Sequence, residues 1–182
     1  MIFPGAYVVV GDITNESVDA IVNAANTTLM GGSGVDGAIH AAGGPDVLAQ
    51  CREIRHTSYP HGLPVGHAVA TTGGSLGCRW IIHTVGPIFE SIDQLPLLES
   101  CYLAAMSLAG QLGATGVAFP LIGAGVYGWP LNLAARAAIV GVRRSMAVNE
   151  NPPLVRFVLF QPEIAEIFCD VAAEVANGSK ST

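Results

Sequence analysis

Residues 18–40 read Val-Asp-Ala-Ile-Val-Asn-Ala-Ala-Asn-Thr-Thr-Leu-Met-Gly-Gly-Ser-Gly-Val-Asp-Gly-Ala-Ile-His, and this stretch indicates the architecture of the chain. An apolar strand at Ala20–Val22 leads through polar residues to a glycine cluster at Gly31–Gly34, and a helical pattern follows as far as His40. The order of strand, glycine loop and helix is typical of α/β proteins. In such sheets, ligands bind beyond the carboxyl ends of the strands, which is where this glycine cluster is expected.

The same order recurs later in the chain. The apolar run Val117–Ile122 predicts a strand, Gly123–Gly128 follows as a second glycine loop, and Pro130 begins a helix. Successive backbone N–H groups near a helix N-terminus form an anion site, so two such loops could hold a diphosphate between them without a basic side chain. For either loop alone, glycines that serve only a tight turn are the alternative interpretation.

The remaining pattern alternates in the same way. Further strands are predicted at Tyr7–Val10, His67–Thr72, Trp80–Val85 and Arg156–Phe160, and further helices after Pro45, at Leu95–Leu112, at Pro130–Met146 and around Ile164–Val175. This alternation predicts an α/β fold, a three-layer α/β/α sandwich around a mixed, mostly parallel central sheet. We predict one domain over residues 1–176 and a flexible C-terminal tail over residues 177–182.

Composition excludes several classes of protein. Hydrophobic residues make up 51% of the chain, but glycines and prolines interrupt every apolar run before the ~18 residues that a membrane span needs. The net charge of −6 and the lack of a basic stripe argue against nucleic-acid binding. The only lysine is Lys180, near the C-terminus, which excludes a buried catalytic lysine.

The cysteines and histidines indicate neither a disulfide framework nor a metal site. The four cysteines are far apart, and the N-terminus lacks the features of a signal peptide, so we predict reduced thiols and a cytoplasmic protein. His56, His61 and His67 are irregularly spaced, and we interpret them as solvated loop residues. We therefore expect no metal and no cofactor.

Several motifs together resemble a macrodomain. They are Gly11–Thr14, Val18–Asn26 and Gly31–His40, followed in the family's order by Ile82–Pro87 and Gly125–Pro130. The resemblance extends over roughly Tyr7 to Val175. The segment Val35-Asp36-Gly37 is similar to the MacroD-type, hydrolytic branch in particular.

The resemblance implies ADP-ribose as the ligand. Asp12 would accept a hydrogen bond from the adenine amino group with Ile13 beside it, although a helix or turn cap is the alternative for Asp12. Tyr127 would pack over the distal ribose, and Phe160 would lie either near the adenine or, as we favour from the sequence, in the core. The phosphates would be bound by backbone N–H groups of Gly32, Ser33, Gly34 and Val35 and of Gly123, Ala124, Gly125, Val126 and Tyr127.

The resemblance assigns catalysis to Asn26 and Asp36, which would orient the distal ribose and its attacking water. Asp36 could activate that water as a general base, or a phosphate of the ligand could activate it and leave Asp36 an orienting role. Asn23 is interpreted as a structural bracket between loops rather than a ligand contact. His40 lies one helical turn after Asp36 and is interpreted mainly as support for it, with packing or catalysis as alternatives.

The sequence departs from the family pattern at three places. Ser33 replaces a usual glycine in the first loop, Gly123-Ala124-Gly125 replaces a more usual Ser-Thr-Gly, and Leu63–His67 replaces a Cys-Pro/Thr-Thr-Gly-Glu-like segment. These departures concern rate and substrate preference rather than ligand binding.

The expected function is hydrolysis of mono-ADP-ribose from protein carboxylates, and also of O-acetyl-ADP-ribose. The alternative is a reader module that binds ADP-ribose without chemistry. A dinucleotide-dependent oxidoreductase is a weaker hypothesis because no Asp or Glu for the ribose lies between Gly128 and Glu150. The expected partners are ADP-ribose or ADP-ribosylated proteins, bound by a monomer.

Overall fold

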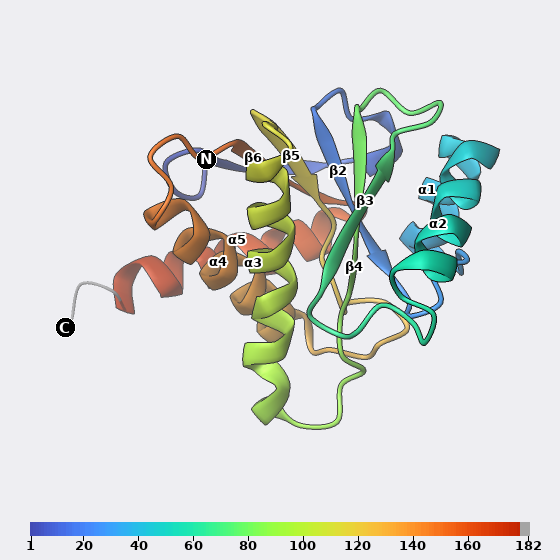
Figure 1. Ribbon diagram of the computed structural model, residues 1–182. Helices are drawn as coiled ribbons and strands as arrows, with labels where there is room; N and C mark the ends of the chain where they lie inside the picture. Colours follow the sequence, from blue (N-terminus) through green and yellow to red (C-terminus); the bar gives the residue numbers. More distant parts are fainter. Residues whose placement is uncertain (179–182) are drawn as a thin grey trace.

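The computed structural model describes residues 1–178, which form one six-stranded sheet between two layers of helices (Figure 1). The strand order is β1-β6-β5-β2-β4-β3. Five strands are parallel, and β3 pairs antiparallel with β4 at one edge. The strands are β1 (Ala6–Val10), β2 (Ala20–Ala25), β3 (Ala68–Thr72), β4 (Trp80–Val85), β5 (Gly116–Phe119) and β6 (Leu154–Leu159). The predicted three-layer sandwich with a mixed, mostly parallel sheet is confirmed.

The helices divide unequally between the two faces of the sheet. Helices α1 and α2 cover one face, and α3, α4 and α5 cover the other (Figure 1). Their bounds are α1 (Gly34–Gly43), α2 (Pro45–Thr57), α3 (Leu95–Gln111), α4 (Leu131–Ala147) and α5 (Pro162–Gly178), and short 3₁₀ helices are η1 (Ile13–Asn15) and η2 (Ile92–Gln94). Pro45 occupies the first turn of α2, as its missing N–H favours.

Alternation along the strands gives each face its own core. On the α3–α5 side, Tyr102, Phe119, Phe157 and Phe168 are fully buried and stack in sequence, with ring centroids 4.8 to 6.1 Å apart. On the α1–α2 side, buried aliphatic residues of β2 and β4 pack against the two helices. A strand buried on both faces has no polar side, which explains the high apolar content of the chain.

Most element boundaries lie within a few residues of those expected. Strand β5 ends at Phe119, three residues before the predicted end, because Pro120 cannot donate a ladder hydrogen bond. Helix α5 continues to Gly178, into the predicted tail of residues 177–182; the rest of that tail lies outside the described residues. The division of the chain into a domain and a flexible tail stays a prediction.

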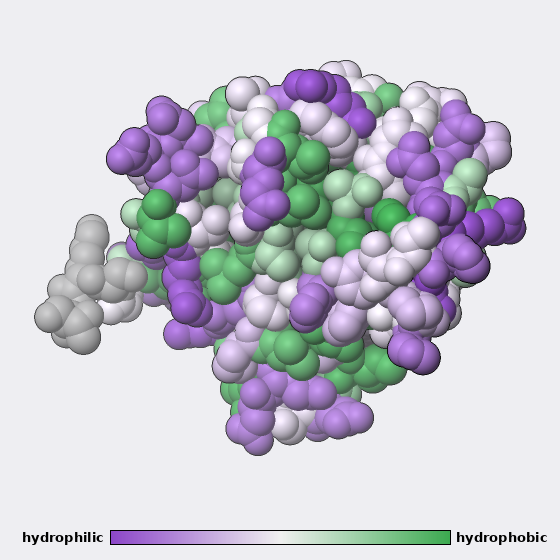
Figure 2. Space-filling model, in the orientation of Figure 1, coloured by the Kyte–Doolittle hydropathy of each residue, from purple (hydrophilic) through white to green (hydrophobic). Residues whose placement is uncertain are grey.

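The surface is mixed in polarity, and the cysteines are unpaired. Hydrophobic residues on the face shown in Figure 2 form separate clusters among hydrophilic ones. Over residues 1–178, no helix has the length and apolarity to cross a membrane. Cys51, Cys78, Cys101 and Cys169 are all free thiols, as predicted.

Candidate functional site

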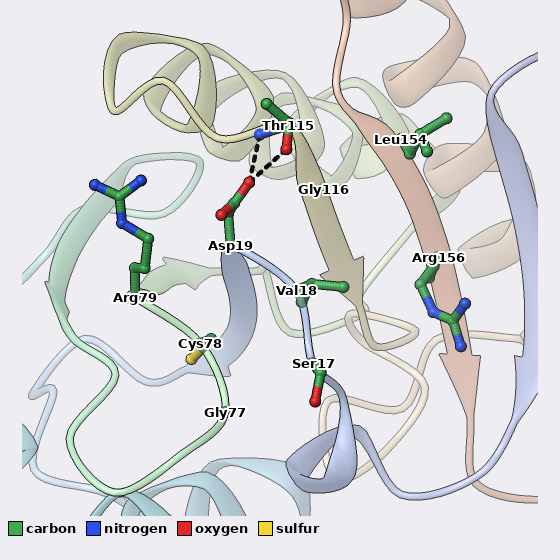
Figure 3. A pocket seen from close by; sticks show the side chains of 10 residues that line it. All are labelled: Ser17, Val18, Asp19, Gly77, Cys78, Arg79, Thr115, Gly116, Leu154 and Arg156. Carbon is green, nitrogen blue, oxygen red and sulfur yellow. Dashed lines mark hydrogen bonds between the residues drawn. The ribbon is translucent and has the colours of Figure 1, made fainter.

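A hollow at the amino ends of the strands has its charged groups already paired. Asp19 accepts hydrogen bonds from the backbone N and from Oγ1 of Thr115, each at 2.7 Å (Figure 3), and these bonds lower the pKa of its carboxyl. Arg156, on the opposite wall, donates to Glu16 at 2.6 Å. Arg79 stacks over the Trp80 ring at 4.1 Å. These charged groups of the hollow are therefore engaged by the protein itself.

A cleft with a volume of about 290 Å³ lies at the carboxyl ends of β2, β4 and β5. The two glycine loops form its opposite sides, as the strand–loop–helix order predicts. Its lining consists of Ala24, Ala25, Asn26, Gly32, Ser33, Gly34, Val35, Asp36, Gly86, Leu121, Ile122, Gly123, Gly125, Val126 and Tyr127. Among the described residues, no lysine or arginine lines this cleft.

Backbone N–H groups supply the positive potential of the cleft. Helix α1 begins at Gly34, so the amides of its first turn lack intrahelical acceptors, and Ser33 makes no side-chain cap. On the opposite side, the amides of Gly125, Val126 and Tyr127 find no acceptor within residues 1–178. Together these donors and the α1 dipole form a site suited to an anion.

Gly32 and Gly123 allow the two loops to pack closely against neighbouring side chains. A Cβ on Gly32 would lie 3.0 Å from Oδ2 of Asp36 and 3.3 Å from Nδ2 of Asn26. Gly123 has a φ of +89°, and a Cβ there would lie 2.7 Å from the Trp129 ring. Side chains at either position would displace the cleft wall.

Asp36 is a buried carboxylate in that wall, only 4% exposed. Its Oδ1 accepts a hydrogen bond from Nδ2 of Asn23 at 2.7 Å, and its Oδ2 lies 3.4 Å from the donor Nδ2 of Asn26. Burial raises the pKa of Asp36, while the Asn23 hydrogen bond and the charge of His40 act in the opposite direction. A carboxylate with a raised pKa is a stronger proton acceptor, which is what a general base requires.

Asn26 shapes the first loop as well as lining the cleft. Its Nδ2 donates to the Gly31 carbonyl at 2.9 Å, and its Oδ1 accepts from the backbone N of Thr28 at 3.0 Å. These bonds hold the amide at the mouth of the loop beside Asp36.

Tyr127 forms the opposite wall, near Gly86. Burial raises the pKa of its hydroxyl, and the charge of Asp36 adds to this effect. The loop is braced from behind, because the Phe89 N–H donates to the Tyr127 carbonyl at 2.9 Å and Trp129 Nε1 donates to the Pro87 carbonyl at 2.8 Å.

The sequence did not identify Gly86, Leu121, Ile122, Ala24 or Ala25 as cleft residues. Gly86 directly follows β4, and the carboxyl-end rule for parallel strands could have identified it.

The predicted adenine residues lie outside the cleft lining. Oδ1 of Asp12 accepts hydrogen bonds from the Thr14 N at 2.9 Å and the Thr14 Oγ1 at 2.7 Å, so Asp12 caps η1, as the alternative interpretation has it. Its Oδ2 makes no hydrogen bond within residues 1–178. Ile13 is buried beside it.

Phe160 corrects one expectation. The favoured interpretation, core packing, is wrong, because β6 ends at Leu159 and the Phe160 side chain is 75% exposed. Ala124, expected to bind phosphate, does not line the cleft, and its amide donates to the Leu121 carbonyl at 3.3 Å.

Asn23 and His40 both lie behind Asp36. Asn23 is fully buried and structural, as interpreted, but it connects Asp36 on α1 to His83 on β4 and not two loops. Nε2 of His40 is 3.5 Å from Oδ1 of Asp36, within ion-pair distance but without hydrogen-bond geometry.

One cluster contains residue types that bind metals, but one of its ligand atoms is engaged in a hydrogen bond. Ligand atoms of His40, Cys51 and His83 lie within 4.8 Å of one another. Nε2 of His83, however, is 2.9 Å from the Thr71 hydroxyl and is engaged in a hydrogen bond. Burial, with the nearby Asp36 charge, raises the pKa of the Cys51 thiol to about 11. His56, His61 and His67 are exposed, as expected, but His56 lies in the last turn of α2 and not in a loop as interpreted.

Comparison with known proteins identifies relatives of high similarity. Residues 22–138 match the model of the Macro domain family. A Macro domain-containing protein of Streptomyces griseus is 54% identical over 172 residues, covering 93% of this chain and 96% of the relative. A Citrobacter rodentium protein named O-acetyl-ADP-ribose deacetylase is 42% identical over 164 residues, covering 89% and 92%.

Solved structures share the fold over nearly the whole chain. The Oceanobacillus iheyensis macrodomain with ADP has a TM-score of 0.90 at 40% identity, covering 95% of this chain and 92% of that one. The Trypanosoma brucei macrodomain in complex with ADP-ribose has a TM-score of 0.83 at 35% identity, covering 93% and 69%.

Proposed function

The chain belongs to the Macro domain family, and on that premise we propose that it binds ADP-ribose in the cleft and hydrolyses an ester bond at the distal ribose. The substrates are mono-ADP-ribosylated protein carboxylates and, as a small molecule, O-acetyl-ADP-ribose. The name of the Citrobacter rodentium relative supports the second substrate.

The proposal of ADP-ribose binding rests on the match between the charge of the ligand and the backbone N–H groups of the two glycine loops. A diphosphate carries its negative charge where the two glycine loops present N–H groups without acceptors. The relatives with ADP and with ADP-ribose support this choice over other anions. Oδ2 of Asp12 and the exposed ring of Phe160 would contact the adenine from the carboxyl ends of β1 and β6.

Catalysis rests on one observation: a carboxylate, Asp36, is buried in the cleft wall with its pKa raised. In the proposed reaction, Asp36 accepts a proton from water as the water oxygen attacks the ester. The bond between the acyl carbon and the ribose oxygen breaks, and the proton held by Asp36 passes to that ribose oxygen. ADP-ribose then leaves with a free hydroxyl, while the acyl group keeps the water oxygen and leaves as its acid. Asn26 and Tyr127 would hold the distal ribose against this carboxylate.

The test is release of free ADP-ribose from a carboxyl-linked mono-ADP-ribosylated protein and from O-acetyl-ADP-ribose. We expect the wild type to turn over both substrates and Asp36→Ala to turn over both far more slowly. Wild-type protein that binds ADP-ribose but releases none from either ester is a reader, and hydrolysis is then wrong.

A further inference from the structure

A buried hydrogen-bond chain runs behind Asp36 on the α1–α2 face of the sheet. Thr71 on β3, His83 on β4 and Asn23 on β2 are neighbours in it, and it ends at Asp36 on α1. Asn23 and His83 occupy the same register position of two parallel strands, so their side chains lie side by side. All four residues are buried, each at most 4% exposed, and the side chain of Asp36 is 6% exposed.

Thr71, at the β3 end of this chain of hydrogen bonds, determines which group donates in each of them. The Thr71 hydroxyl has a single proton and donates it to the Thr72 carbonyl at 3.1 Å. The 2.9 Å contact between Thr71 Oγ1 and His83 Nε2 therefore needs its proton on Nε2. Nδ1 of His83 is then unprotonated, and its lone pair accepts a hydrogen bond from Nδ2 of Asn23 at 3.1 Å. The second Asn23 proton is directed to Oδ1 of Asp36 at 2.7 Å.

The Asn23 amide is oriented through its nitrogen alone. Its Oδ1 is buried without a hydrogen-bond partner among the described residues. A flipped amide would place that oxygen against two acceptors, the lone pair of His83 and the carboxylate of Asp36. A proton on His83 Nδ1 would instead oppose the Asn23 N–H and release its hold on Asp36. Full burial, together with the charge of His40, lowers the pKa of His83 to about 3, so the ring stays neutral at the pH of hydrolysis.

We propose that His83 is a positioning residue for the hydrolysis: its Nδ1 lone pair fixes the Asn23 carboxamide, which holds the Asp36 carboxylate in its catalytic orientation and charge state. This inference rests on the proposed function for its consequence in catalysis. The hydrogen-bond arrangement itself does not depend on that function.

Several other groups face Asp36, and the proposal is specific to one of them. His40 of α1, Cys51 of α2 and Tyr127 of the second loop all interact with its charge. Of all these neighbours, the Asn23 amide is the one with a short hydrogen bond to the carboxylate. Removing the acceptor that orients Asn23 should therefore raise the pKa of Asp36 further.

Two substitutions separate the two nitrogens of His83. In His83→Asn, the amide oxygen lies where Nδ1 was and still accepts from Asn23. In His83→Gln, the longer side chain keeps a donor for Thr71 but has no acceptor at the Nδ1 position. The pKa of Asp36 is measured by NMR titration of its side-chain carboxyl carbon, alongside the pH profile of kcat and the Kd for ADP-ribose.

We expect His83→Gln to raise the pKa of Asp36 by about one unit and to move the acid limb of kcat by the same amount, a tenfold loss of kcat on that limb. His83→Asn should restore most of both values, and Kd should change less than about twofold in each. Thr71→Val, which frees the ring to change tautomer, should shift both values in the same direction by less. Thr71→Val also tests the proposal if the His83 variants do not fold.

In the wild type, long-range ¹H–¹⁵N spectra should show the His83 proton on Nε2. A proton on Nδ1, or an Asp36 pKa unchanged in His83→Gln, would overturn the inference. Equal shifts in His83→Gln and His83→Asn would also overturn it, since they would mean that burial volume rather than the lone pair matters. Wild-type protein without hydrolysis overturns the proposed function, and the NMR measurements still decide the hydrogen-bond arrangement.

Discussion

Nδ2 of Asn23 lies 2.7 Å from Oδ1 of Asp36, a hydrogen bond between a strand of the sheet and the first turn of α1. The acid of the site is therefore held from behind, and its second oxygen, next to Asn26 and Gly32, is the one closest to the cleft wall. An orientation fixed by the core would let the carboxylate act, under the proposed function, on a ligand that the loops bind independently.

The first prediction separates chemistry from binding. Asp36→Ala should lower kcat for a carboxyl-linked ADP-ribose ester by roughly 10²–10⁴-fold, the usual contribution of a general base. Affinity for ADP-ribose should change little, because the diphosphate and adenine contacts come from other segments. Single-turnover kinetics and calorimetry measure the two quantities. Hydrolysis at the wild-type rate would exclude Asp36 and leave activation by a substrate phosphate.

The second prediction concerns stability and pH. Burial raises the pKa of Asp36 in the folded state above its unfolded value, so the native state binds the proton more tightly. Stability therefore falls as the pH rises from the unfolded value of about 3.9 through the folded one. Asp36→Asn should be more thermostable than the wild type at pH 7, and the difference in Tm should narrow toward pH 4. Asp170→Asn, which removes an exposed carboxylate of α5, controls for net charge. A gap that widens as the pH falls would contradict this sign.

The third prediction tests the adenine contact. Asp12→Ala should weaken ADP-ribose binding by roughly 1.5–3 kcal/mol, the range for a hydrogen bond to a charged group. It should also destabilise the fold by about 1 kcal/mol through loss of the η1 cap. Thr14→Val is the matched control, since it keeps the carboxylate and the backbone bond but removes the Thr14 hydroxyl. Calorimetry that gives equal affinity for Asp12→Ala and wild type would remove Asp12 from the site.

The fourth prediction tests the second loop. Nothing lies within 4 Å of a Cβ built on Gly125, so a side chain fits there without unfolding the protein. Gly125→Glu would bring a negative charge into the anion site and should abolish stabilisation by ADP-ribose in a thermal-shift assay. Gly110→Glu adds the same charge to an exposed position of α3 and should leave that stabilisation intact. Persisting stabilisation in Gly125→Glu would show that the ligand binds elsewhere.

Local patterns predicted the fold and both glycine loops, because strand, loop and helix are adjacent in sequence. Contacts between residues far apart in the sequence could not be predicted from local patterns. Asn23 and His83 are 60 positions apart, and their contact depends on β2 and β4 pairing in register. The exposure of Phe160 depends on where β6 ends, and a hydrophobic pattern locates the end of a strand only to within about two to four residues. Asp12 caps η1 through one oxygen, which is the alternative interpretation, and its contact with the adenine stays a prediction.

The cleft between the glycine loops has a consequence for how its specificity can change over evolutionary time. Its anion donors are main-chain amides, and no described lysine or arginine lines it. A main-chain donor survives nearly every codon change, cannot be acetylated, and does not titrate. Under the proposed function, recognition of charge would therefore be inherited with the backbone. Side chains on the rim such as Val126, which is 84% exposed, would be free to diversify toward different modified targets.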